Sequence, residues 1–321
     1  MKVFFFPIRH QNKIIKINKE IIESLGHEVF ALKYVYEIKH FFDFDKIIIL
    51  NWIEDQPYIT SYSILKSWFY FLLYLVTIIC CKLTSRKIIW IKHNYKPHTN
   101  KPNSYRHSVT CYLMTLLNIK ETTLENYLGD HYIPHPLYLS DEELNFLASN
   151  SETKAEVMVV FFGHVKRYKG LHEALKVWPK DVPLSICGKV ESGTYKQELL
   201  NIIMSRNINI TIEDRFLEES ELESLLISAS HIFLPHEANT MISSGSFYHA
   251  ISYGCNILAT KSEFSESKYF LHNFVLISDL SSLSLAALKE SLIQRNEVIH
   301  ESLKYYSRFR LKKVWDSILN N

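Results

Sequence analysis

The chain has 321 residues, of which 47% are hydrophobic and 22% charged, with 36 Lys and Arg against 34 Asp and Glu. These values are typical of globular proteins, so disordered, collagen-like and coiled-coil chains are excluded. A formal charge of +2 gives no overall basic field, and nucleic acid is therefore not an expected partner. The length favours two domains over one.

Glycine and cysteine usage disfavours several common kinds of site. The eight glycines spell neither G-x-G-x-x-G nor the P-loop pattern, which argues against the usual dinucleotide enzymes and P-loop NTPases. The five cysteines are odd in number and show no C-x-x-C spacing, so no disulfide framework or zinc site is indicated. The apolar start ends at Pro7 and is too short for a signal-peptide core. We therefore expect a cytoplasmic protein.

The first half of the chain alternates short apolar runs with helical patterns. Strands are expected at residues 2–7, 27–32, 46–52 and 87–92, and helices at residues 13–25, 63–83 and 105–117. This order predicts a parallel sheet with helices on both faces. The polar residues 141–154 end the pattern, so we place a domain boundary near residue 150.

One helical segment leaves two interpretations open. Residues 67–81 carry no charge, but a membrane span needs about 20 apolar residues. The segment is either a buried helix or an element that lies on a membrane surface. Residues 1–140 contain 17 Lys and Arg against 11 Asp and Glu, and such an excess attracts anionic lipid. The second interpretation predicts peripheral attachment to the inner face of the cytoplasmic membrane.

A second alternation follows the boundary. Strands are expected at residues 157–162, 184–187, 208–212, 231–234 and 256–259, helices at residues 170–178, 194–206, 218–227 and 246–253, and one or two amphipathic helices at residues 290–319. We predict an α/β protein with two tandem Rossmann-like doubly wound domains and a cleft between them. The domains are residues 1–150 and 151–295, with a C-terminal helix at residues 296–321 that packs back toward the first domain. Ligands of open α/β sheets bind outside the carboxyl ends of the strands, so the loops after strands should build the site.

The loop after the first strand of the second half gathers positive charge. Gly163 ends that strand, and His164, Lys166, Arg167 and Lys169 precede the next helix. Cations that converge at a strand end beside helix-start amides suit a diphosphate. A solvated basic loop is the alternative from the pattern alone.

A Ser-rich turn opens a later helix. Ser243, Ser244, Gly245 and Ser246 follow a strand and a loop that contains Glu237. Hydroxyls and backbone N–H groups at a helix start form an anion site, and a glycine lets the backbone approach a ligand closely. A plain N-cap, with Ser244 or Ser246 as the capping residue, is the alternative.

Polar residues also follow the strand at residues 87–92. His93 stands at the strand end, and Asn94 and His98 come directly after it. A lone histidine is usually structural, but two histidines with an asparagine and two lysines in seven residues make a functional role equally plausible.

Together these motifs resemble the GT-B glycosyltransferases, in particular family four and related bacterial polysaccharide enzymes. The segment from Gly163 to Gly170 has the family's spacing. The segment from Pro235 to Gly254 has the family's order of features: a Pro after a strand, a Ser-rich loop, and a helix that ends in Gly. Residues 51–54, 92–94 and 133–136 resemble a subgroup used in exopolysaccharide or O-antigen assembly. The resemblance covers nearly the whole chain and implies the GT-B fold.

The resemblance implies a donor site in the second domain. Lys169 would pair with the diphosphate of a UDP- or GDP-sugar, and Lys166 or Arg167 would supply a second cation, since His164 replaces the family's arginine. Many family members carry two Glu eight positions apart, where this chain has Met241 and His249. Residues 244–246 would then hold phosphate, and Glu237 would take over part of the missing role.

The resemblance also implies the chemistry. Charge that develops on a departing diphosphate is met by cations and helix dipoles, so no metal or other cofactor is expected. If the reaction inverts the anomeric centre, His93 or Glu54 would act as base, with Asn94 and His98 on the acceptor side. The acceptor is a saccharide, free or lipid-linked. Two alternatives stay open: a non-catalytic nucleotide- or sugar-binding component of an assembly complex, and a nucleotide-sugar epimerase or hydrolase.

Overall fold

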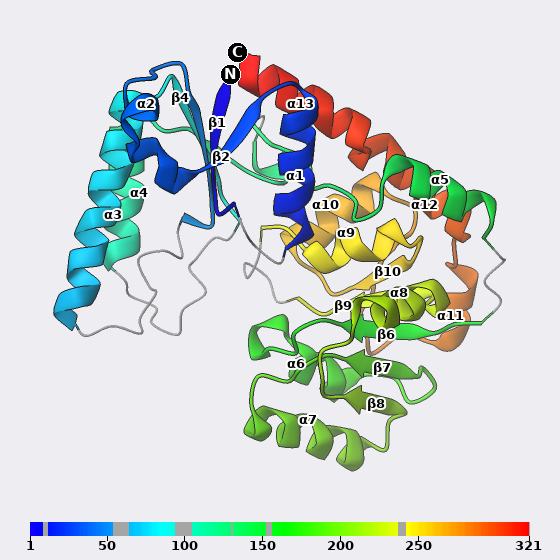
Figure 1. The fold of residues 1–321 in the computed structure, drawn as a ribbon. Helices are drawn as coiled ribbons and strands as arrows, with labels where there is room; N and C mark the ends of the chain where they lie inside the picture. Colours follow the sequence, from blue (N-terminus) through cyan, green and yellow to red (C-terminus); the bar gives the residue numbers. More distant parts are fainter. Residues whose placement is uncertain are drawn as a thin grey trace. The chain divides into compact units, whose positions relative to one another are not determined.

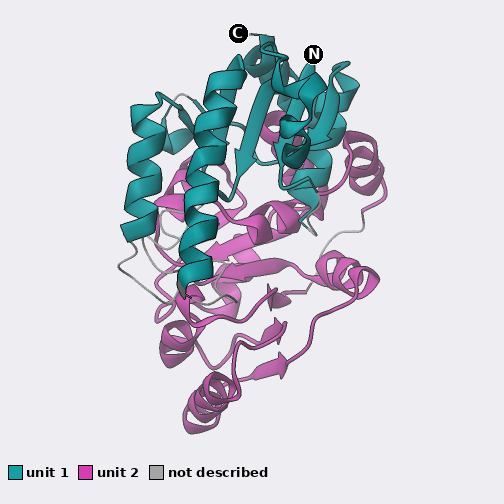
Figure 2. Cartoon of the chain, turned by 60° about the vertical axis from the view of Figure 1, so that its left-hand side comes forward, with its two compact units in different colours: residues 1–136, 308–321 teal, residues 137–307 magenta. Residues whose placement is uncertain are grey.

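The computed structural model describes residues 1–8, 12–53, 64–93, 105–129, 131–151, 156–236 and 242–320. The chain divides into two compact units, residues 1–136 with 308–321 (unit 1) and residues 137–307 (unit 2), as Figure 2 shows. Each unit contains one sheet in which all pairs of neighbouring strands are parallel. The predicted class, α/β with two Rossmann-like doubly wound domains, is therefore confirmed.

Unit 1 is built on a five-stranded sheet in the order β2-β1-β3-β4-β5 (Figure 1). Its strands are β1 (Lys2–Phe6), β2 (Glu28–Ala31), β3 (Ile47–Asn51), β4 (Lys87–Ile91) and β5 (Glu121–Thr122). Its helices are α1 (Lys13–Ser24), η1 (Leu32–Tyr36), α2 (Ile38–Phe41), α3 (Ile64–Thr84), α4 (Tyr105–Leu116), η3 (Asn126–Leu128) and α13 (Arg308–Asn320). The central strands are apolar over most of their length because both faces of the sheet are covered. One face packs against α1 and α13, the other against α3 and α4.

Unit 2 is built on a six-stranded sheet in the order β11-β10-β9-β6-β7-β8 (Figure 1). Its strands are β6 (Val159–Phe162), β7 (Leu184–Cys187), β8 (Ile210–Glu213), β9 (His231–Leu234), β10 (Asn256–Ala259) and β11 (Val275–Ile277). Its helices are α5 (Asp141–Ser149), η4 (Arg167–Lys169), α6 (Leu171–Val177), α7 (Gly193–Arg206), α8 (Glu219–Ser228), α9 (Gly245–Ser252), α10 (Glu263–Leu271), α11 (Leu285–Glu290) and α12 (Arg295–Tyr306). The strand order reverses between β6 and β9, and such a switch point is where open α/β sheets bind ligands.

The bounds of the two units differ from those expected from composition. The polar segment near residue 150 contains α5, which starts with a capping box at Ser140 and packs against α12 inside unit 2. The C-terminal tail forms two helices that meet at Ser307, and only α13 belongs to unit 1. There Trp315 is fully buried and its Nε1–H donates to Asn18 Oδ1 over 2.8 Å. Polar composition at α5 thus marks an exposed helix face, and the chain passes between the units at residues 136–137 and 307–308.

The interpretation of α3 as a buried helix is wrong. Within α3, Phe71, Ile78 and Cys81 are buried against the sheet, whereas most other large apolar side chains are exposed. The helix is long and apolar enough to cross a membrane by length and composition over Leu65–Thr84, and 22% of that window is buried. Sequence alone could not decide this point, because a core helix and an exposed apolar helix have the same composition.

Candidate functional site

The candidate site of unit 2 lies at the switch point of its sheet. β6 and β9 pair only at their first residues, with Val159 beside His231 and Val160 beside Ile232. Gly163 directly follows β6, and His236 lies two residues after β9. The two loops that the sequence singled out in this half therefore begin at the two strands that flank the switch point.

Three of the predicted residues converge here. Gly163 has φ +94°, and a Cβ built on it would lie 3.8 Å from Lys169 Nζ and 3.9 Å from Ser246 Oγ. The absent side chain thus leaves space bordered by an ammonium group and a hydroxyl. Lys169 is placed by the η4 turn, in which its N–H donates to Lys166 O over 3.0 Å. Gly170 then takes a left-handed conformation that starts α6.

Lys169 lies in an electrostatic setting that favours an anion. Burial, followed by the charge of Lys166, lowers the pKa of Lys169 to about 8. Its Nζ lies 5.2 Å from the centre of the Phe161 ring. Among the described residues, no carboxylate forms an ion pair with Lys166 or Lys169. Two neighbouring cations without an acidic partner are the charge pattern of a phosphate site.

The backbone of this loop is held by a second glycine. Gly163 N–H donates to Cys187 O over 3.0 Å, which brings the ends of β6 and β7 together. A Cβ on Gly188 would lie only 2.0 Å from Gly163 O, so no side chain fits at position 188. The close approach of these two glycines sets the position of Gly163.

The serines at the start of α9 have different roles. Ser244 is the N-cap: its Oγ is buried and accepts a hydrogen bond from Phe247 N–H over 3.3 Å. The expectation of a plain N-cap is therefore confirmed for Ser244. Ser246 Oγ instead lies near Gly163, 3.9 Å from the position of a Cβ built on that glycine. Ser243 precedes the cap and is half-buried. A Cβ on Gly245 would lie 3.2 Å from Tyr138 Oη, so Tyr138 packs directly on the helix start.

Two residues of this site were not among the predicted ones. Tyr138 stacks on His249, with ring centres 4.3 Å apart and planes 3° apart, and burial raises the pKa of Tyr138 to about 12. His236 is buried, and burial together with the charge of Lys169 lowers its pKa to about 3, which keeps the imidazole neutral. A signal for His236 existed, since it follows a strand as His93 does. No sequence signal pointed to Tyr138, because it lies 107 residues before Gly245 in the chain.

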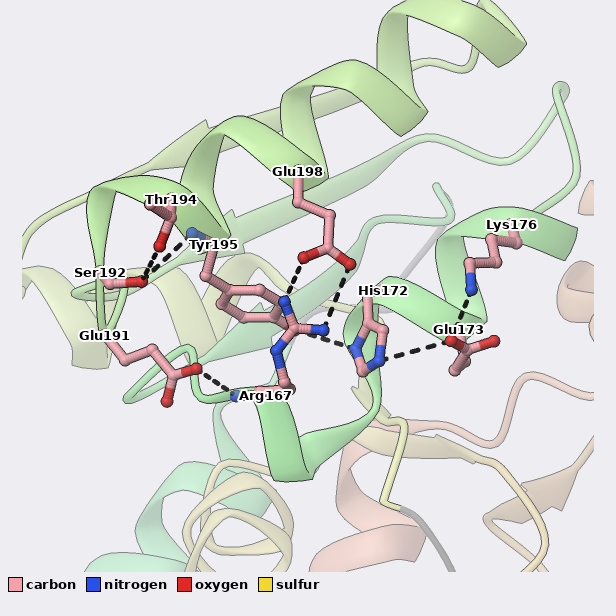
Figure 3. Close-up of polar contacts among 9 residues, drawn as sticks. All are labelled: Arg167, His172, Glu173, Lys176, Glu191, Ser192, Thr194, Tyr195 and Glu198. Carbon is pink, nitrogen blue, oxygen red and sulfur yellow. Dashed lines mark hydrogen bonds and ion pairs between the residues drawn. The ribbon is translucent and has the colours of Figure 1, made fainter. Parts of the chain in front are cut away.

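Arg167 does not point toward Lys169 and Gly163 but pairs with a residue of α7. Its guanidinium forms an ion pair with Glu198 and lies over the Tyr195 ring, 4.7 Å from the ring centre (Figure 3). Its backbone N–H donates to Glu191 Oε1 over 3.1 Å. Lys166 is therefore the better candidate for the second cation. His164 is exposed and packs edge-on against Phe216, with its pKa lowered by burial and by the charges of Lys166 and Lys169.

In unit 1, three strand ends meet at His93. Asn51 Nδ2 donates to Phe6 O over 3.1 Å, which turns Asn51 Oδ1 toward His93 Nε2 at 3.0 Å. Nε2 therefore carries the proton of the neutral ring, and Nδ1 is the basic nitrogen. The ring is buried and stacks on Trp52 with ring centres 4.0 Å apart. This arrangement fixes both the tautomer and the orientation of His93.

Four predicted residues, Glu54, Asn94, His98 and Glu237, lie outside the described residues. Within the described part of the chain, no group of three His, Cys, Asp or Glu is placed to hold a metal ion. Metal independence stays a prediction.

No family model and no curated protein sequence matches the chain. Solved structures do match it. AviGT4, a glycosyltransferase involved in avilamycin A biosynthesis, is 12% identical with a TM-score of 0.61, over 99% of this chain and 96% of that one. HepE from Anabaena in complex with UDP is 13% identical with a TM-score of 0.51, over 100% of both chains. A trehalose-6-phosphate structure from E. coli bound with UDP-2-fluoro glucose is 10% identical with a TM-score of 0.57, over 99% of both.

These likenesses establish the fold class. The chain has the GT-B fold, with two Rossmann-like domains, and the resemblance seen in the sequence is confirmed at that level.

Proposed function

We propose that the protein is a glycosyltransferase that moves a hexose from a UDP- or GDP-sugar to a saccharide acceptor. The observation that carries this proposal is the convergence of Gly163, Lys169 and Ser246 at the switch point of unit 2. The GT-B fold supports it, as do the UDP and the UDP-sugar derivative in two of the similar structures.

The proposed reaction places negative charge where the cations are. As the bond between sugar and diphosphate breaks, Lys169 and Lys166 stabilise the leaving group and Ser246 donates a hydrogen bond to it. The buried, neutral His236 adds no competing positive charge beside Lys169. We propose that unit 1 supplies the acceptor side. If the reaction inverts, His93 takes the acceptor proton at Nδ1.

The proposal is tested by ligand binding and by product analysis. A thermal-shift screen with UDP, GDP, ADP, CMP and dTDP, each with and without Mg²⁺, should identify one nucleotide that stabilises the protein without metal. A ligand at 100 times its Kd stabilises the native state by about 2.7 kcal/mol. Nucleotide release from the matching sugar donor that depends on an acceptor indicates transfer. Acceptor-independent release of free sugar would indicate a hydrolase, and binding without turnover a binding component.

His93→Gln is expected to lower kcat by a factor of about 100 or more while changing the KM of the donor little. General base catalysis typically contributes 10²–10⁴-fold, and glutamine has no group that can accept the proton. Steady-state transfer rates of the variant and the wild type, measured at saturating donor and acceptor, check this. Unchanged kcat in the variant would remove His93 from the mechanism.

We further propose that the protein is cytoplasmic, attaches to the membrane surface through α3 and α4, and acts on a lipid-linked acceptor in bacterial surface polysaccharide synthesis. The α3–α4 face, as defined here, comprises the exposed side chains Leu65, Phe69, Leu72, Val76, Leu83, Tyr105, Tyr112 and Leu116. The α3 members recur at intervals of three, four or seven residues and so share one side of the helix. Residues 56–120 contain nine Lys and Arg and no Asp or Glu. An apolar helix face in a segment with only basic charges fits an anionic lipid surface.

The double variant Leu72→Gln, Val76→Gln is expected to reduce co-sedimentation with phosphatidylglycerol vesicles at least fivefold. Both side chains are more than half exposed, so their replacement removes apolar area from the lipid contact without opening the core. Val177→Gln with Met204→Gln, which changes exposed apolar residues of unit 2, is the matched control and should bind like the wild type. Equal binding of both double variants would contradict attachment through α3.

A further inference from the structure

A cavity of about 750 Å³ lies in unit 1 at the start of β4, apart from the residues discussed so far. Within the part of the chain that the structure describes, five cationic side chains from separate parts of the unit line it, and none of the lining residues is Asp or Glu. They are Lys82, Arg86, Lys87, Lys120 and Lys313. We call this cavity the basic pocket.

The basic pocket forms where the sheet edge is open. β5 pairs with β4 only at Trp90 and Ile91. The preceding residues of β4, Ile88 and Ile89, have no described strand beside them on that side, and both line the pocket. The end of α3 and the exposed side of α13 supply further walls. The shortness of β5 thus creates a recess with an apolar floor and a cationic rim.

The cations of the basic pocket repel one another. Burial, and then the charges of Arg86 and Lys120, lower the pKa of Lys87. Lys87 Nζ donates to Ile318 O over 2.8 Å, which uses one of its three protons. Arg86 contacts Asp45 at 3.6 Å, and Asp45 is exposed and does not line the pocket. Among the described residues, no carboxylate pairs with Lys82, Lys87 or Lys120, so an anion would relieve the repulsion.

The size of the basic pocket limits which ligands would fill it. Small-molecule pockets typically enclose 300–1,000 Å³, and a single inorganic phosphate would fill only a small part of this one. Lys and Arg recognise phosphate through charge and multiple donors. We propose that the basic pocket binds a ligand that carries two or more phosphate groups, from either a soluble phosphorylated metabolite or the headgroup of an anionic lipid.

The basic pocket lies away from His93, the residue proposed for the acceptor side. Lys87 is the first residue of β4, whereas His93 follows the end of the same strand. A rise of about 3.3 Å per residue separates the two by about 20 Å, at opposite ends of the strand. Phosphate binding in the basic pocket does not depend on the proposed function, whereas its description as an accessory site rests on the proposed place of His93 in the reaction.

The test uses a variant that removes two exposed cations of the pocket, Lys120→Gln with Lys313→Gln. Its matched control is Lys16→Gln with Lys39→Gln, which removes two exposed lysines of unit 1 outside the pocket. Inorganic pyrophosphate is titrated into the full chain by calorimetry at low salt. We expect at least tenfold weaker binding, or loss of one binding step, in the pocket variant only. Pyrophosphate bound at Lys169 contributes equally to both variants, so it cancels from the comparison.

Vesicles distinguish the two sources of the phosphate groups. Binding to cardiolipin-containing and to pure phosphatidylcholine vesicles is measured for the same two variants. Loss of pyrophosphate binding with unchanged cardiolipin binding assigns a soluble ligand. Loss of both, with pyrophosphate competing against cardiolipin, assigns a lipid headgroup. Identical pyrophosphate isotherms for the two variants, or no pyrophosphate binding by the wild type, would overturn the proposal.

Discussion

Lys169→Met is expected to lower kcat/KM for the sugar donor at least 100-fold without unfolding the protein. Methionine keeps most of the length of the half-buried side chain but removes the ammonium group beside Gly163 and Ser246. Loss of one preorganised group that stabilises transition-state charge typically costs 10²–10³-fold. The fold should be no less stable, because the substitution also removes the repulsion between Lys169 and Lys166. Donor turnover and urea unfolding, measured on the same preparation, check both parts.

The pH dependence of donor binding provides a second measurement on this substitution. Because the pKa of Lys169 is lowered to about 8, the side chain is about nine-tenths protonated at pH 7 and loses its charge as the pH rises through 8. A bound diphosphate needs the protonated form, so the Kd of the donor nucleotide should be constant at low pH and increase above about pH 8. In Lys169→Met this increase should be absent.

The control for both measurements is Lys176→Met. Lys176 is an exposed lysine of the same unit that pairs with Glu173, away from Gly163. Its variant should keep the activity and the pH profile of the wild type. If Lys169→Met retained more than a third of the wild-type kcat/KM, the donor site would have to lie elsewhere.

The parts of the site that could be predicted are those encoded in one continuous segment. An apolar strand, Gly163, and then a run of basic residues before a helix define a strand-end loop, and the structure has that loop. The ion pair between Arg167 and Glu198 could not be predicted, because Glu198 lies 31 residues further along the chain, on α7. Ser246 was one of three serines in its turn that the sequence could not distinguish. Only the tertiary structure separates it from Ser244, whose hydroxyl caps α9.

The prediction of strands and helices was limited in a similar way, by how much pattern each one shows in the sequence. β3 and β6 are buried at every position and almost entirely apolar, so each could be recognised as a continuous apolar run. β5 has only two residues, Glu121 and Thr122, and no apolar pattern marked it. β11 and the short helix α11 were missed for the same reason. Patterns report burial of a whole element, and these elements are too short or too mixed to show one.

Gly188→Ala is expected to destabilise unit 2 by about 3 kcal/mol and to weaken donor binding as well. The new Cβ would lie 2.0 Å from Gly163 O and 2.8 Å from Gly163 C, both backbone atoms, so the clash is relieved only if β6 and β7 separate at their ends. Gly188 also has φ +156°, where residues other than glycine are strained by about 1–3 kcal/mol. For a domain of this size, about 3 kcal/mol corresponds to a fall in Tm of roughly 6–12 °C.

Gly193→Ala separates this effect from the general cost of replacing a glycine. A Cβ on Gly193 meets no atom within 4 Å, and Gly193 lies in the first turn of α7. Alanine at this exposed helical position should leave Tm unchanged or raise it slightly. The two substitutions add the same methyl group within the same unit, so the difference between their melting curves measures the contact with Gly163. Gly163 borders Lys169 and Ser246. Displacement of Gly163 by the new Cβ should therefore also weaken nucleotide binding, and only in Gly188→Ala. Matching Tm values for the two variants would show that β6 and β7 tolerate a side chain there and that the glycine pair does not position the site.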